Sequence, residues 1–238
     1  MRGSFAGRAA LGAAIFVVAQ AAQAGTITGT AVFTGTVPSL KPLSVAAEPI
    51  CFKKHESVPN EMLVLGTGNT MANVLVRVVS GLPAGKTWPA PTEPVTMDQN
   101  GCQYKPHVMG IMVGQPFKVL NSDGVLHNVH ALPKVNATFN MAMPPTRKEA
   151  SATFGKAEGM FVIKCDVHPW MQSYMGVFGD PFFAVTGADG KFTIANLPAG
   201  TYEIEAWHEK LGTQKATVTV GASDTKTTGF KFAPPAPK

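Results

Sequence analysis

The sequence predicts an all-β protein built from β-sandwiches, and three observations support this fold class. Helical periodicity is scarce, and 24 glycines and 19 prolines interrupt the 238 residues too often for long helices. Alternating or β-branched segments recur along the chain. Turn signals such as Ser122-Asp123-Gly124 and Asp189-Gly190 separate these segments. Short strands joined by such turns are typical of sandwiches.

Seven segments are predicted strands, because each is rich in β-branched residues or alternates apolar with polar ones. These segments are residues 26–33, 72–79, 117–120, 160–164, 191–194, 202–206 and 216–220. They are spread over the whole chain after residue 25. This part of the chain is long enough for one large all-β domain or two smaller ones.

The first 24 residues have the layout of a secretory signal peptide. Arg2 and Arg8 precede an apolar run at 9–18, and Ala22-Gln23-Ala24 provides a small-x-small cleavage pattern. The run is too short for a stable membrane anchor, and no later segment approaches eighteen consecutive apolar residues. We therefore expect a periplasmic or secreted bacterial protein with no membrane insertion after signal cleavage. The sequence predicts no oligomeric state.

The charge of the chain argues against a nucleic-acid partner. The formal net charge is +5, and the predicted signal peptide contributes two arginines and no acidic residue, which leaves +3. No cluster of lysines and arginines forms a stripe that could follow a phosphate backbone. No nucleophilic triad or paired-carboxylate motif indicates a hydrolase either.

The three cysteines are informative in an exported protein, because that compartment permits disulfides. Cys51 and Cys102 are the natural pair. Cys165 then remains as a free thiol, which is unusual unless something such as a metal ion holds its sulfur.

The strongest local motif is Cys165-Asp-Val-His168-Pro-Trp-Met171. Thiolate, imidazole and thioether are soft ligands that suit copper, and a strong histidine-cysteine set with a weak methionine is typical of blue-copper sites. Three ligands on one loop need a fourth from another element, and His127 in the segment 121–130 can supply it. His130 has the opposite strand parity and is expected on the other face.

Residues 95–180, with these two motifs, resemble the cupredoxins of the amicyanin and plastocyanin type. The resemblance implies a Greek-key sandwich that binds one copper ion. It implies His127, Cys165 and His168 as equatorial ligands and Met171 as the axial ligand. It also implies that Asn128 ties the two ligand loops together, with the Asp166 region as its hydrogen-bond partner.

Two features depart from that family pattern. Asp166 follows the ligand cysteine, where a hydroxyl or small residue is usual, and a carboxylate there could lower the reduction potential. A second methionine, Met175, lies close enough to fit a longer ligand loop and is the alternative axial ligand.

The segments from Val185 to Ile194 and from Leu197 to Ala206 resemble a carboxypeptidase regulatory-like, or transthyretin-like, β-sandwich with a carbohydrate-binding-like fold. The Leu197-Pro-Ala-Gly-Thr-Tyr202 turn is expected to set a tyrosine across a corner. The opening strands of such a domain lie far upstream, so we expect one sandwich from residues 25–88 and 181–238, with the copper domain, 89–180, inserted. A tandem arrangement is the alternative.

The combined interpretation is a one-electron carrier and not an enzyme, because four protein ligands leave no open position at the metal. Its expected partner is a redox protein such as a cytochrome c or a periplasmic dehydrogenase, and the resemblance implies a methylamine-utilisation context. An exposed edge of His168, with Pro169 and Trp170 around it, is the expected electron exit. The alternatives are copper storage or delivery, and a carbohydrate- or protein-binding module with a structural metal site.

Overall fold

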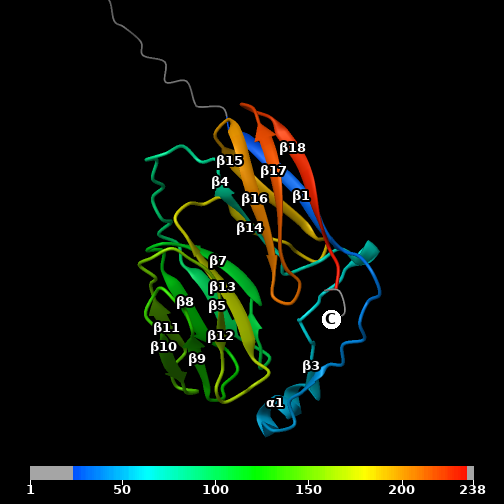
Figure 1. Cartoon of the computed structure of the whole chain (residues 1–238). Helices are drawn as coiled ribbons and strands as arrows, with labels where there is room; N and C mark the ends of the chain where they lie inside the picture. Colours follow the sequence, from blue (N-terminus) through cyan, green and yellow to red (C-terminus); the bar gives the residue numbers. More distant parts are fainter. Residues whose placement is uncertain (1–23, 235–238) are drawn as a thin grey trace, which may run out of the picture.

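The computed structural model describes residues 24–234, and within that range nearly every regular element is a strand (Figure 1). The all-β prediction is therefore confirmed. The only helices in the described range are α1 (Pro49–Lys54) and the single turn η1 (Thr67–Asn69). The predicted signal peptide lies outside the described residues except for Ala24. None of the helices in residues 24–234 has the length and apolar character that crossing a membrane requires.

One pair of sheets joins the two ends of the described chain (Figure 1). The sheets have the strand orders β15-β1-β18 and β14-β4-β16-β17. Their strands are β1 (Gly25–Phe33), β4 (Leu75–Ser80), β14 (Phe183–Val185), β15 (Lys191–Leu197), β16 (Gly200–His208), β17 (Gly212–Val220) and β18 (Thr225–Phe232). β1 runs parallel to β18, so that Phe33 lies opposite Phe232. Both sheets pack on one apolar core.

The middle of the chain forms a second pair of sheets, with the strand orders β10-β9-β12-β13-β7 and β11-β8-β5-β6. The strands are β5 (Val95–Gln99), β6 (Tyr104–Lys105), β7 (Val108–Met112), β8 (Phe117–Asn121), β9 (His127–Ala131), β10 (Phe139–Met143), β11 (Glu149–Ala152), β12 (Glu158–Lys164) and β13 (Gln172–Phe178). β5 runs parallel to β8, and β13 runs parallel to β7. Its own core contains Cys165, Met171 and Met175.

Six of the seven predicted strand segments lie within observed strands, and the seventh, 72–79, begins three residues before β4, which starts at Leu75. The alternation of the predicted strands explains the burial: along β1 every second side chain is buried. The expected tyrosine corner is present, because the Tyr202 hydroxyl donates to the Pro198 carbonyl over 2.5 Å.

A smaller apolar cluster joins the two pairs of sheets. Leu75 of β4 packs with Val108 of β7 and Phe178 of β13. The Arg77 guanidinium lies 5.2 Å from the centre of the Phe178 ring. At the same boundary His107 Nε2 lies 2.6 Å from a carboxylate oxygen of Glu209. The boundary therefore combines apolar packing with a buried histidine–carboxylate hydrogen bond.

Residues 43–58, here called the cap segment, lie outside both pairs of sheets and beside the middle sandwich (Figure 1). The cap segment contains β2 (Leu43–Ser44), α1 and β3 (Ser57–Val58). A disulfide joins Cys51 in α1 to Cys102, with the two Cα atoms 5.9 Å apart. Val45 and Val58 pack with this disulfide and with Val125 in a small core. The cap segment matters for function because it approaches and covers His168, one of the predicted metal ligands.

Candidate metal centre

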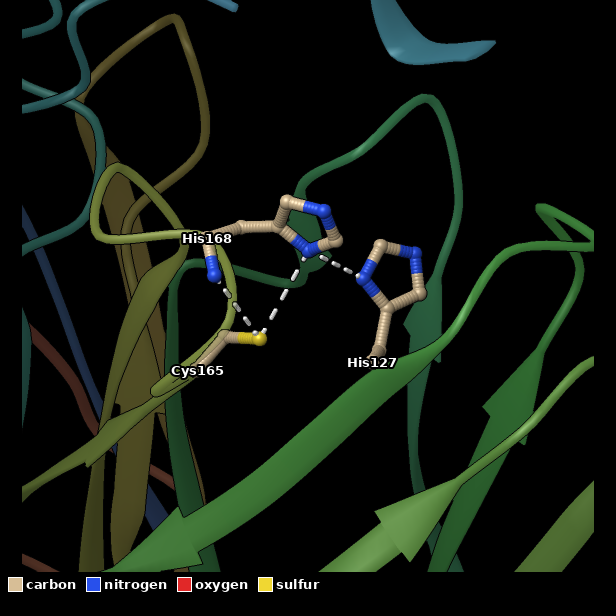
Figure 2. Close-up of side chains that lie close together, drawn as sticks. All are labelled: His127, Cys165 and His168. Carbon is tan, nitrogen blue, oxygen red and sulfur yellow. Dashed lines mark hydrogen bonds between the residues drawn. The ribbon is translucent and has the colours of Figure 1, made fainter. Parts of the chain in front are cut away.

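Three potential metal-ligating side chains converge at one end of the middle sandwich. His127 begins β9, whereas Cys165 and His168 lie in the loop between β12 and β13. β12 pairs with β9, so the end of β12 delivers this loop to the strand that carries His127. Figure 2 shows the two imidazole rings and the Cys165 sulfur directed toward one another.

The potential ligand atoms are close enough to surround one ion. The Nδ1 atoms of His127 and His168 lie 2.9 Å apart, and Cys165 Sγ lies 3.7 Å from His168 Nδ1. All three residues are buried, and their ligand atoms lie within 4.8 Å of one another. Two nitrogens and one sulfur in a buried cluster can hold a soft transition-metal ion.

The backbone of the ligand loop is closed by its own hydrogen bonds. The Met171 N–H donates to the His168 carbonyl over 2.9 Å, and the Cys165 N–H donates to the Met171 carbonyl over 3.1 Å. The His168 N–H donates to Cys165 Sγ over 3.4 Å. These bonds restrain Cys165, His168 and Met171 relative to one another.

The Cys165 sulfur is chemically prepared to lose its proton. Burial alone would raise the pKa of the thiol, but hydrogen bonding to His127 and His168 outweighs burial and lowers this pKa to about 5. The thiolate is the form that binds metals. At neutral pH the site therefore offers an anionic sulfur without requiring a metal to displace the proton.

Asp123 also belongs to the surroundings of the metal centre, although the sequence indicated it only as part of a turn. Its Oδ2 lies 3.0 Å from His127 Nε2, the nitrogen that faces away from the cluster. The same carboxylate accepts from the backbone N–H groups of Gly101 and Cys102, at 2.7 and 2.8 Å, and from Lys54 Nζ at 3.2 Å. A carboxylate on the far nitrogen of a ligating histidine fixes its tautomer and ring orientation. The available sequence signal was an acidic residue four positions before the histidine.

The expected exposed edge of His168 is absent, and this expectation was wrong. His168 is only 1% exposed. The cap segment approaches the ring, with Glu48 Oε2 3.6 Å from His168 Nε2. The Trp170 indole turns toward the cap disulfide, and its Nε1–H donates to the Cys102 carbonyl over 3.0 Å. The physical reason is the disulfide, which holds the cap segment beside the ligand loop.

Asn128 links the two metal-site segments. Its Oδ1 accepts from the Asp166 N–H over 2.7 Å and lies 3.3 Å from Cys165 Sγ, and its Nδ2 donates to Asp166 Oδ2 over 3.2 Å. The Tyr104 hydroxyl donates to the Asn128 carbonyl. The structure thus brings Asn128 and Asp166 together next to the cysteine.

The Asp166 carboxylate is engaged with partners other than the sulfur. It lies 3.0 Å from Lys164 Nζ, 2.9 Å from His130 Nδ1 and 2.8 Å from Asn140 Nδ2. The ion pair with Lys164 is the main cause that lowers the pKa of Asp166 to about 2. His130 therefore serves this carboxylate on the other face of β9, away from the His127–His168 cluster.

The two candidate axial methionines occupy different depths of the sandwich. Both are buried in its core. Met171 lies in the closed loop, where its backbone bonds to Cys165 and His168. Met175 lies within β13 opposite Phe161, four residues farther from the loop. At about 3.3 Å per residue, this places Met175 roughly 13 Å deeper along the strand.

Comparisons with known proteins return partial similarities. The model of polysaccharide lyase family 4, domain II, matches residues 156–228. No curated protein matches the chain at a significant level. Among solved structures, a mutant of amicyanin in its oxidized state is 22% identical over 43% of this chain and 98% of its own length, with a TM-score of 0.32.

Two further solved structures have the same level of identity. A copper-containing nitrite reductase (NirK) from Thermus scotoductus SA-01 is 22% identical over 42% of this chain, with a TM-score of 0.34. The match spans only 26% of that reductase. A purple cupredoxin from Nitrosopumilus maritimus is 22% identical over 35% of this chain and 98% of its own length, with a TM-score of 0.30.

Proposed function

We propose that this protein binds one copper ion through His127, Cys165, His168 and Met171 and carries single electrons between redox partners. The observation that carries the proposal is the convergence of two Nδ1 atoms and one sulfur in a buried cluster. The donor set fits copper, since imidazole and thiolate with a weak thioether are the ligands of blue-copper sites. A bound copper ion would supply one-electron chemistry by alternating between Cu(I) and Cu(II).

The protein's own contribution to this chemistry is a rigid, water-poor site. The loop hydrogen bonds hold Cys165 and His168 in place, and Asn128 ties the loop to β9. Asp123 holds the ring of His127 from behind. These contacts between protein groups would restrain the ligand side chains in both copper oxidation states, which favours rapid electron transfer.

We assign the axial position to Met171 and not to Met175. The closed loop keeps Met171 beside Cys165, whereas the register of β13 carries Met175 deeper into the core. In this account Met175 serves as core packing.

The proposed domain organisation follows the strand pairing. We propose that residues 89–180 form a copper domain inserted into a second sandwich whose strands come from 25–88 and 181–238, because β1 and β4 pair with strands that come after residue 180. The cap segment, within 25–88, packs beside the copper domain instead. We further propose a periplasmic or secreted location, on the evidence of the predicted signal peptide and the Cys51–Cys102 disulfide.

The proposed partner is a redox protein such as a cytochrome c or a periplasmic dehydrogenase. With His168 covered, the exposed large apolar side chains adjacent in sequence to the two histidine ligands are Leu126, 47% exposed, and Val167, 44% exposed. Such apolar side chains suit transient docking of another protein. The electron then has to leave through the residues around the site, not through a bare imidazole edge.

Copper storage or delivery is the second candidate function, and one observation favours it. The cap segment buries His168 and is fixed by a disulfide, which should slow the loss of the metal. A binding module with a structural metal site is the less favoured alternative.

Electrochemistry and metal exchange distinguish the two copper functions. The electron carrier predicts a reversible one-electron wave for the copper-loaded protein, rapid oxidation of the Cu(I) form by a small inorganic oxidant, and little copper transfer to a chelator on that timescale. Storage or delivery predicts a poorly reversible wave and a slow, reversible transfer of copper to the chelator. A variant lacking the sulfur ligand, Cys165→Ser, serves as the control in both assays.

A further inference from the structure

We propose that Glu48, which lies in the cap segment outside the copper sandwich, is a positioning residue for the metal centre and acts on the far nitrogen of His168. This inference rests on the proposed copper function, because it concerns how one of the proposed ligands is held. Neither of the ligand motifs contains Glu48, which lies 120 positions before His168 in the sequence.

The first observation is a buried nitrogen that has no hydrogen-bond partner. His168 is 1% exposed, and within the described residues its Nε2 makes no hydrogen bond. Its other nitrogen, Nδ1, faces His127 and Cys165 (Figure 2). When Nδ1 binds a metal, a neutral imidazole carries its proton on Nε2 and needs an acceptor there.

The second observation is that Glu48 is placed to be that acceptor. Its Oε2 lies 3.6 Å from His168 Nε2, beyond hydrogen-bond length but within reach of a small side-chain movement. Its Oε1 accepts from the Ile50 N–H over 3.2 Å, which makes Glu48 the N-cap of α1. One oxygen thus holds the helix, and the other faces the ligand.

The third observation is that the position of Glu48 is fixed from three sides. The Glu48 N–H donates to the Val45 carbonyl over 3.0 Å. The Cys51–Cys102 disulfide anchors α1. At the other end of α1, Lys54 Nζ donates to the carbonyl of Asp123 at 2.9 Å and lies 3.2 Å from its carboxylate. A carboxylate held in this way can orient a ring, whereas a mobile surface glutamate cannot.

These contacts give both histidines the same arrangement. Asp123 lies behind the Nε2 atom of His127, and Glu48 lies behind the Nε2 atom of His168. Helix α1 spans the two, with Glu48 at its N-terminal end and Lys54 bonded to Asp123 at its C-terminal end. The cap segment therefore completes the metal centre as well as covering it.

The test compares Glu48→Asp with Glu56→Asp and the unaltered full-length protein. Aspartate at position 48 still caps α1 and keeps the charge, but its side chain is one methylene too short to approach His168. Glu56 is an exposed glutamate of the same cap segment and provides the matched control. Far-ultraviolet and near-ultraviolet circular dichroism check that each variant is folded.

The first readout is metal affinity, measured by competition with a chelator for Cu(II) and separately for Zn(II). We expect Glu48→Asp to weaken binding about 10- to 100-fold, the usual effect of losing such a partner of a ligating histidine, with no change in Glu56→Asp. Unaltered affinity in Glu48→Asp overturns the inference.

The second readout is the His168 ring itself, observed by nitrogen-15 NMR in the diamagnetic Zn(II)-loaded protein. We expect a slowly exchanging proton on Nε2 whose exchange accelerates in Glu48→Asp. An Nε2 proton that exchanges equally fast in both proteins contradicts the inference.

The two failures can be told apart. If the unaltered protein shows the thiolate-to-copper absorption band and Glu48→Asp matches it in affinity and exchange, only the role of Glu48 is overturned. If the unaltered protein binds no copper through Cys165, the proposed function and this inference both fail.

Discussion

The Nδ1 atoms of His127 and His168 lie 2.9 Å apart, although the two residues are 41 positions apart in sequence and belong to different elements. At this distance one nitrogen must be unprotonated and accept from the other, because two N–H groups cannot point at each other. Each ring is also held near a carboxylate on its opposite side. The arrangement places the Nδ1 atoms of both rings beside the Cys165 sulfur, which is the grouping of donor atoms that a shared metal ion requires.

Asp123 should be important for both stability and metal binding. In Asp123→Asn one oxygen remains to serve His127 and the N–H groups of Gly101 and Cys102. We expect the free energy of unfolding to fall by about 1–3 kcal/mol, the cost of leaving a buried donor unpaired. We expect copper affinity to fall about 10- to 100-fold. Chemical denaturation and chelator competition measure the two effects.

The exposed Asp189→Asn substitution, on a turn of the other sandwich, is the control for Asp123→Asn. Equal changes in unfolding free energy and copper affinity in the two variants would mean that the Asp123 carboxylate makes no specific contribution to either property.

The Cys51–Cys102 disulfide should stabilise the apoprotein. It closes a loop with a sequence separation of 51, for which the loss of chain entropy in the unfolded state corresponds to about 4 kcal/mol. We expect the Cys51→Ala, Cys102→Ala double variant to lose about 2–4 kcal/mol of unfolding free energy, as measured by guanidinium denaturation. We also expect hydrogen exchange to accelerate in residues 49–54. A cap segment with unchanged exchange protection would show that apolar packing alone holds it in place.

Met171 and Met175 can be separated by paired substitutions. Both methionines are buried in the same core, so Met→Leu at either position should cost less than about 1.5 kcal/mol of stability. We expect Met171→Leu to alter the copper absorption and EPR spectra and Met175→Leu to leave them unchanged. The reverse pattern would assign the axial position to Met175.

As the pH decreases, the titration of His208 should lower the free energy of unfolding of the apoprotein. Burial lowers the pKa of this histidine to about 4, whereas the unfolded chain titrates near 6.5. Below pH 6.5 His208 binds a proton in the unfolded state but stays neutral in the folded state. The free energy of unfolding therefore declines until about pH 4, where the folded state also becomes protonated. The total decline is about 3 kcal/mol.

Denaturation of the unaltered protein and of His208→Gln between pH 7 and 4.5 measures this contribution. We expect a shallower dependence in the variant. Identical slopes would assign the pH dependence to other groups.

The fold class and the ligand motifs could be predicted because each depends on local sequence. Strand segments such as 191–194 show the alternation that one buried face imposes, and the Cys165–His168–Met171 loop carries three soft donors within seven residues. The corner formed by Tyr202 and Pro198 was equally local, because the turn sequence encodes it.

The contacts of Glu48 and Asp123 with the site could not be predicted from the sequence, unlike the contact between Asn128 and Asp166, because no local motif encodes them. Glu48 lies near His168 because the Cys51–Cys102 disulfide and apolar packing hold the cap segment beside the ligand loop. A sequence pattern carries no information about this approach, so the expectation of an exposed His168 edge failed. Asp123 was visible as a turn residue, but its bond to His127 depends on how the 121–127 turn folds back on the strand.

The most direct test of the central claim is the optical absorption and EPR spectrum of the Cu(II)-loaded protein beside that of Cys165→Ser. Coordination by the Cys165 thiolate predicts an intense charge-transfer band near about 600 nm and a narrow copper hyperfine splitting, both lost in the variant. A colourless protein, or a spectrum that Cys165→Ser leaves unchanged, would contradict a copper centre at His127, Cys165 and His168.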